Sequence, residues 1–162
     1  MSAAAALVNA LPVAEAAGAL RRCCGSERWV ERMIAGRPYP DERALLGAAE
    51  RVWWDLEPED WHEAFRAHPR IGERGGDTWS RNEQAGVAGA TTDVRRRLAR
   101  GNEAYERRFG YVYLVCATGR GTAELLSDLE ARLTNAPAEE LRVAAAEQAK
   151  ITRLRLEKLE DP

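Results

Sequence analysis

The chain has 162 residues, 45% of them hydrophobic and 31% charged, which is typical of a globular domain rather than of a disordered or membrane protein. Its 24 lysines and arginines are balanced by 26 aspartates and glutamates, so the net charge of −2 disfavours nucleic acid as the main partner. No uncharged apolar run approaches the roughly 20 residues of a membrane span. We therefore expect a single domain over residues 1–162 that binds neither nucleic acid nor a membrane.

Three cysteines, Cys23, Cys24 and Cys116, occur without CxxC spacing. This odd number predicts buried thiols in a reducing compartment rather than a disulfide framework. The Ala-rich start of the chain, Met1 to Leu11, has no lysine or arginine before its apolar residues and is a poor signal peptide. We therefore expect a cytoplasmic protein.

Apolar residues recur at helical spacing through the first part of the chain. Ser26 and Asp41 are good N-cap residues, and Pro58 suits the first turn of a helix. Pro69 disfavours helical geometry in the residue before it, so the last of these helices must stop near His68. The predicted helices are Leu11–Arg22, one from Ser26 to Gly36, one from Asp41 through Trp53, and one from Pro58 to about His68.

The second part of the chain begins with a Gly-containing loop, Arg70–Thr78, after which helical patterns return. The run Tyr111–Ala117 is strongly β-prone but has no partner strand, so we interpret it as an extended buried connector. The remaining predicted helices are one starting at Thr78 or Ser80, one from Thr92 to Gly110, one from Thr122 to Leu133, and one from Ala138 to Glu160. The fold class predicted is all-α: a single-domain multi-helix bundle with one extended buried connector.

His68 is one of only two histidines, and it lies at a helix end followed by a proline and a glycine loop. An imidazole there can project into a cleft, where its ordinary pKa near ~6.5 suits proton transfer. The alternative is a structural histidine that hydrogen-bonds the last carbonyls of its helix. His62 is expected to be a surface residue.

Ser80, Glu83 and Gln84 are spaced i, i+3 and i+4, so on a helix they share one face. A hydroxyl, a carboxylate and an amide on one face could bind a polar heterocycle while the carboxylate handles a proton. The alternative is N-terminal capping, in which Ser80 and Glu83 bond backbone amides. Capping does not explain Gln84.

Arg155 lies within the apolar stripe of the last predicted helix, four residues from both Ile151 and Leu159. A buried guanidinium needs a partner, which could be a structural carboxylate or an anionic or carbonyl-bearing ligand. By contrast, the run Arg95–Arg97 is expected to be a solvated face. It is the feature that would favour a nucleic-acid binder.

The sequence contains no HExxH motif, no paired Cys/His spacing, and no Walker or GxGxxG fingerprint. We therefore expect a site without a metal or cofactor. The main alternative to an enzyme is a helical interaction module, in which the singled-out residues are caps and a structural ion pair. An enzyme requires His68, Glu83 and Arg155 to converge on one pocket.

Four strings, taken together, closely resemble the 2-oxo-4-hydroxy-4-carboxy-5-ureidoimidazoline (OHCU) decarboxylase family, and they run in the family's order. They are Phe65–Gly72, Ser80–Gly86, Asn102–Tyr111 and Glu147–Leu156. The resemblance implies an all-helical, cofactor-free enzyme, commonly a homodimer. Such an enzyme removes carbon dioxide from the unstable product of 5-hydroxyisourate hydrolysis, a small ureide, and makes (S)-allantoin.

At the matching positions, the resemblance implies that His68 and Glu83 are the catalytic pair and that Arg155 holds the substrate. It further implies that the backbone of the extended connector bonds the substrate ring. The implied substrate-binding residues are Pro69, Ser80, Gln84, Leu114, Val115, Cys116, Ala117 and Arg155.

Overall fold

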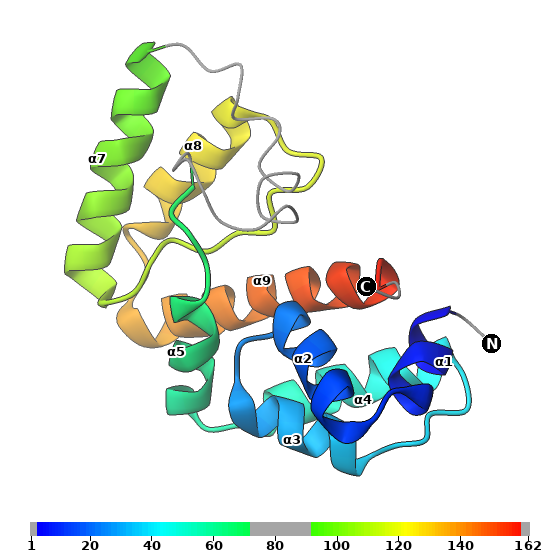
Figure 1. Cartoon of the computed structure of the whole chain (residues 1–162). Coiled ribbons are helices and arrows are strands. Elements are labelled where there is room, and N and C mark those ends of the chain that lie inside the picture. The colour runs from blue at the N-terminus through cyan, green and yellow to red at the C-terminus, as the bar shows by residue number, and fades with distance from the viewer. Residues whose placement is uncertain (1–2, 72–91, 160–162) are drawn as a thin grey trace. The chain divides into compact units, whose positions relative to one another are not determined.

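The computed structural model describes residues 3–71 and 92–159, and within these ranges it contains eight helices and no strand (Figure 1). The predicted all-α fold class is confirmed. The chain divides into two compact units, Met1–Ala64 with Ala149–Pro162, and Phe65–Gln148. The helix predicted to start at Thr78 or Ser80 lies outside the described residues. In the described ranges, no helix is both long and apolar enough to cross a bilayer.

The first unit is built from short helices that pack in sequence, α2 against α3 and α3 against α4, with α1 against both α2 and α4. These helices are α1 (Ala3–Ala10), α2 (Val13–Cys23), α3 (Glu27–Ala35), α4 (Glu42–Trp54) and most of α5 (Pro58–Arg66). The C-terminal part of α9 (Pro137–Glu157) completes the unit.

Side chains cap two of these helices as predicted. Ser26 Oγ accepts a hydrogen bond from the Trp29 amide at 3.3 Å, and Asp41 Oδ1 accepts one from the Ala44 amide at 2.8 Å. Trp29 is fully buried, and its indole nitrogen donates to the Ala49 carbonyl at 3.0 Å, which ties α3 to α4. The caps therefore set where α3 and α4 start, and the tryptophan sets how they pack.

Helix α1 was not predicted from the sequence. It is only eight residues long, with no acidic residue in its first turn and no basic residue in its last, and isolated helices of this length are unstable in water. The structure holds it through Asn9, whose side chain donates to the Tyr39 carbonyl at 2.8 Å and accepts from the Tyr39 amide at 2.7 Å. Tertiary contacts thus stabilise a helix that local propensity alone does not specify.

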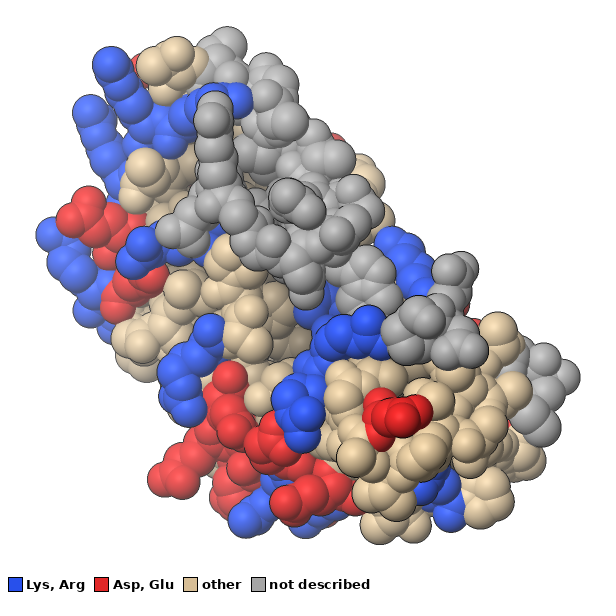
Figure 2. Space-filling view, in the orientation of Figure 1, with Lys and Arg blue, Asp and Glu red and all other residues tan. Residues whose placement is uncertain are grey.

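The second unit contains α7 (Thr92–Phe109), α8 (Thr122–Arg132) and the first part of α9. Helices α7 and α8 pack closely, since a Cβ atom on Gly101 would lie 2.5 Å from a methyl carbon of Leu129. Gly110 ends α7 with a φ of +84°, a left-handed conformation that favours glycine, as the sequence predicted. Arg95, Arg96 and Arg97 are exposed on α7, and Figure 2 shows basic and acidic side chains intermixed over this helix.

Residues Tyr111–Ala117 follow α7 as a segment without regular structure, and Tyr113, Leu114, Val115 and Ala117 are buried. This confirms that the predicted connector is buried and that it forms neither a helix nor a strand.

A buried ion pair anchors this connector. The Arg132 Nη2 atom lies 2.6 Å from Glu140 Oε2, and both side chains are almost fully buried. Arg132 Nη1 donates to the Leu114 carbonyl at 2.8 Å, while the Tyr105 hydroxyl donates to Glu140. Although burial disfavours the charge, the bond to Glu140 raises the pKa of Arg132, so the guanidinium remains ionised.

Replacing Arg132 by alanine should reduce the free energy of unfolding by about 3–5 kcal/mol, because Glu140 would remain buried without its counter-charge. Urea unfolding followed by circular dichroism measures this loss. Arg97→Ala is the matched control. It removes a half-exposed ion pair with Glu130, whose Nη2–Oε1 distance is 2.8 Å, and should cost less than about 1 kcal/mol. Equal losses in the two variants would contradict the role assigned to the buried pair.

Candidate active site

His68 lies just beyond the end of α5, where its amide donates to the Phe65 carbonyl at 3.2 Å. The helix stops before Pro69, as predicted. The imidazole Nε2 atom lies 2.7 Å from the side-chain oxygen Oε1 of Gln148, on α9. His68 is partly exposed as a residue, whereas Gln148 is fully buried. The structure therefore combines a fixed imidazole edge with access to the ring.

Helix α7 holds the residues that follow His68. Asn102 Nδ2 donates to the Ile71 carbonyl at 2.9 Å, and Arg70 Nε lies 3.0 Å from both carboxylate oxygens of Glu106. Asn102 and Glu106 are four residues apart, so they lie on successive turns of one helix face. Sequence reasoning did not assign them a role, although their i, i+4 spacing within the string Asn102–Tyr111 was visible.

The connector is held by side chains from two helices. The Cys116 amide donates to Glu147 Oε1 at 3.1 Å, and the Leu114 carbonyl accepts from Arg132. The Ala117 carbonyl accepts from the Arg120 amide at 3.0 Å. Within the described ranges, the backbone N–H and C=O of Val115 make no hydrogen bond to another residue. Val115 thus carries backbone groups that could serve a ligand.

Glu147 and Gln148 are neighbours on α9, and they hold the two parts of the candidate site within the second unit. Glu147 bonds the connector at Cys116, and Gln148 bonds His68. Glu147 is 7% exposed and Gln148 is fully buried. The structure therefore ties His68 and the connector, two of the regions predicted to contact substrate, to adjacent residues of α9.

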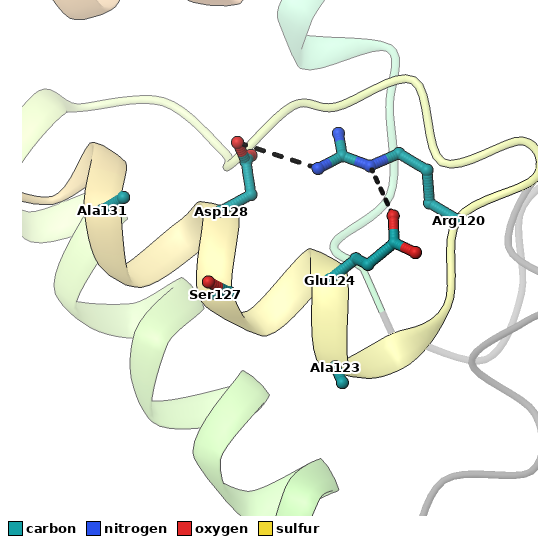
Figure 3. A pocket seen from close by; sticks show the side chains of 6 residues that line it. All are labelled: Arg120, Ala123, Glu124, Ser127, Asp128 and Ala131. Carbon is teal, nitrogen blue, oxygen red and sulfur yellow. Dashed lines mark ion pairs between the residues drawn. The ribbon is translucent and has the colours of Figure 1, made fainter.

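A shallow groove of about 500 Å³ lies beside α8, and none of those predicted site residues that the structure describes lines it. Figure 3 shows the Arg120 guanidinium between Glu124 and Asp128 at its edge, at N–O distances of 3.9 and 3.8 Å. Arg120 also lies 3.9 Å from Glu147. Its charge faces three carboxylates, so Arg120 supports the position of Glu147 electrostatically rather than marking a second anion site.

Arg155 lies on α9 in the first unit and is 7% exposed, so its predicted burial is confirmed. Its Nη1 atom donates to the Arg22 carbonyl at 3.2 Å, at the C-terminal end of α2. Cys23 and Cys24 lie close by. Burial raises the pKa of each thiol to about 12, and the Arg155 charge opposes this rise. The guanidinium therefore occupies a mostly apolar environment, where a negatively charged or carbonyl group would interact with it strongly.

Ser80, Glu83 and Gln84 lie outside the described residues. His68, Pro69 and the residues Leu114–Ala117 belong to the second unit, whereas Arg155 belongs to the first. Helix α9 contributes residues to both units, Gln148 to the second and Arg155 to the first. In the described ranges, no group of three or more His, Cys, Asp or Glu side chains could hold a metal ion.

A fixed, accessible imidazole beside a buried connector defines a candidate acid–base site in an all-helical protein. The family model for OHCU decarboxylase matches residues 9–157, so the chain belongs to the OHCU decarboxylase family.

Two curated relatives show the extent of the similarity. The "Uric acid degradation bifunctional protein TTL" of Arabidopsis thaliana is 36% identical over 146 residues, covering 85% of this chain and 45% of that protein. The chain thus spans less than half the length of this relative. The 2-oxo-4-hydroxy-4-carboxy-5-ureidoimidazoline decarboxylase of Amia calva is 32% identical over 130 residues, covering 76% of this chain and 74% of that protein.

A solved structure is also similar. The crystal structure of an OHCU decarboxylase in the presence of (S)-allantoin aligns with a TM-score of 0.77 at 34% identity, over 86% of this chain and 94% of that chain.

The bond between Glu147 and Cys116 can be tested by amide hydrogen exchange of the connector. Glu147→Ala removes the acceptor, so the Cys116 amide should exchange about tenfold faster, which corresponds to a charge-assisted bond of about 1.5 kcal/mol. Glu147→Gln keeps an acceptor oxygen and should exchange at a rate close to wild type. An unchanged rate in Glu147→Ala would show that the bond does not hold the connector.

The buried thiols make stability depend on alkaline pH. Cys23 and Cys24 have a pKa raised to about 12 in the folded chain, against roughly 8.5 when unfolded. Unfolding therefore releases protons above pH ~8.5, and the stability present below that pH is lost as pH rises toward 12. Urea unfolding should show a loss of about 2 kcal/mol per thiol between pH 8.5 and 10. A Cys23→Ala/Cys24→Ala variant should lose correspondingly less over the same interval, and an identical loss would refute the assignment.

Proposed function

We propose that the chain catalyses the decarboxylation of 2-oxo-4-hydroxy-4-carboxy-5-ureidoimidazoline to (S)-allantoin in urate degradation. The observation that carries the proposal is the His68 imidazole, fixed by Gln148 on α9 beside a connector held by the next residue, Glu147. Family membership and similarity to an OHCU decarboxylase crystallised in the presence of (S)-allantoin support the same substrate class.

The reaction breaks the bond between the carboxylate and the ring carbon, and carbon dioxide leaves. The electron pair of this bond passes into the neighbouring imine and carbonyl of the substrate, which serve as its electron sink. One proton must then be added to one face of the ring carbon. The protein therefore has to orient the carboxylate out of the ring plane, stabilise the enediolate-like charge that develops, and control the proton.

His68 is proposed to hydrogen-bond the hydroxyl group on the carboxylate-bearing carbon and to take or shield its proton. An imidazole suits this role because its ordinary pKa lies near the operating pH. Glu83 would deliver the proton to one face of the carbanion, which fixes the stereochemistry of the product. Although Glu83 lies outside the described residues, its role follows from its position in the family string.

The remaining residues are proposed to bind. Ser80 and Gln84 would hydrogen-bond polar groups of the substrate, and the backbone from Leu114 to Ala117 would bond its ring. Arg155 and Gln84 would hold the ureido and ring carbonyl groups. The buried position of Arg155 supports this role, because a guanidinium attracts an oxygen more strongly where water is excluded.

We also propose that the chain works as a homodimer in the cytoplasm, with residues 1–162 acting as one domain. Helix α9 contributes to both compact units, which supports the single domain. Cys23, Cys24 and Cys116 are not joined in disulfides in the described ranges, which supports a reducing compartment. Pro69, next to His68, is proposed to contact the substrate.

His68→Gln and Glu83→Ala should each lower turnover on the order of 10²–10⁴-fold, because each removes a group that handles a proton. Fresh urate, urate oxidase and 5-hydroxyisourate hydrolase generate the substrate, and polarimetry follows the formation of optically active allantoin. Spontaneous decay gives a racemic product, so optical activity reports the enzyme alone. His62→Gln is the control and should remain close to wild type. Near-normal formation of optically active allantoin in both His68→Gln and Glu83→Ala would contradict the proposed roles.

A further inference from the structure

Gln148 is a buried polar residue to which the proposed chemistry assigns no role. It lies near the middle of α9, its side chain is fully buried, and its Oε1 atom is 2.7 Å from His68 Nε2. The two residues are 80 positions apart in the chain. This distance is that of a hydrogen bond, and its direction depends on which ring nitrogen of His68 carries the proton.

The direction follows from the chemistry of the two groups. An amide oxygen can only accept a hydrogen bond, so a bond to Oε1 requires a proton on His68 Nε2. A neutral imidazole carries one proton, so its lone pair then lies on Nδ1. Losing this bond would remove a hydrogen bond from a fully buried amide, which is unfavourable away from water.

A neutral partner also suits the charge of the surroundings. A carboxylate at position 148 would stabilise the imidazolium and raise the pKa of His68, whereas an amide fixes the ring without adding charge. The residue before Gln148, Glu147, already supplies a carboxylate, which bonds the Cys116 amide. A second negative charge would oppose the binding of a substrate that itself carries a carboxylate.

We propose that Gln148 is a positioning residue that holds His68 as the neutral Nε2–H tautomer and presents Nδ1 as the basic nitrogen. The assignment of Nδ1 to the substrate proton rests on the proposed function, whereas the tautomer itself does not. Glu147, the residue before Gln148, accepts the bond that holds the connector at Cys116. One turn of α9 therefore bonds both the His68 ring and the connector.

Nitrogen NMR of the full chain labelled with ¹⁵N-histidine tests the tautomer without any substrate. The chain has only two histidines, so His62→Gln assigns the remaining ring to His68. At neutral pH the wild-type ring should carry its proton on Nε2. Gln148→Met, which keeps the side-chain volume but removes the acceptor, should give a mixture of tautomers. Thermal unfolding by circular dichroism checks that each variant is folded.

Activity provides the second measurement. Gln148→Met should lower kcat about 10–100-fold with little change in KM, by analogy with partners that orient metal-binding histidines. Gln148→Glu keeps an acceptor for Nε2–H, unlike Gln148→Met, and should raise the pKa of His68 by at least about one unit. The part of the pH–activity profile that reports His68 should shift to higher pH by the same amount. The charged groups Arg66, Arg70, Glu106, Glu147 and Arg120 on the surrounding elements remain the same in all variants.

A wild-type ring protonated on Nδ1 would overturn the proposal, as would a folded Gln148→Met variant that keeps both the Nε2–H signal and the wild-type kcat. A different result would refute the proposed function while leaving the positioning role in place. A chain that makes no optically active allantoin, but whose His68 still loses its defined tautomer in Gln148→Met, would refute the activity and support the positioning role.

Discussion

Helix α9 holds the connector at two points and His68 at a third. Glu140 pairs with Arg132, which in turn bonds the Leu114 carbonyl, and Glu147 accepts the Cys116 amide. Glu140 and Glu147 are seven residues apart, so they share one face about 10 Å apart along the helix axis. Because a helix is rigid at this scale, the positions of the connector and the imidazole are coupled. The geometry of the candidate site depends on this coupling.

Such coupling matters because decarboxylation of a conjugated ureide leaves little covalent chemistry to the protein. The rate then depends on placing hydrogen-bond donors, a proton acceptor and a charge before the reaction starts. Buried side chains that bond backbone groups lose little freedom on substrate binding, unlike groups on exposed loops. The buried ion pair of Arg132 and Glu140 therefore fixes, through the Leu114 carbonyl, a segment that the proposed function places against the substrate.

The sequence predicted most helices because their apolar periods and their caps, Ser26 and Asp41, are local signals. It also predicted the connector, because a single β-prone segment without a partner strand can satisfy its side chains only by burial. Helix α1 was not predicted because it is stabilised by hydrogen bonds between Asn9 and Tyr39, which is thirty residues away. A contact of that kind leaves no periodic trace in the sequence.

The same distinction applies to the site. His68 and Arg155 attract notice locally, one as a rare imidazole at a helix end and the other as a charge in an apolar stripe. Their partners could not be read from the sequence, because Gln148 and the Arg22 carbonyl lie far along the chain. Glu147 and Gln148 stood within a string already noted for its family resemblance, yet only the fold shows what they bond.

The proposed function requires an imidazole, the connector backbone and a buried guanidinium to act on one small ureide. A crystal structure of the full chain with (S)-allantoin bound tests it most directly. The account predicts that allantoin contacts His68 and the backbone between Leu114 and Ala117, with the Arg155 guanidinium within hydrogen-bond distance. Allantoin bound away from His68, or an Arg155 that bonds the Arg22 carbonyl and does not contact the ligand, would contradict it.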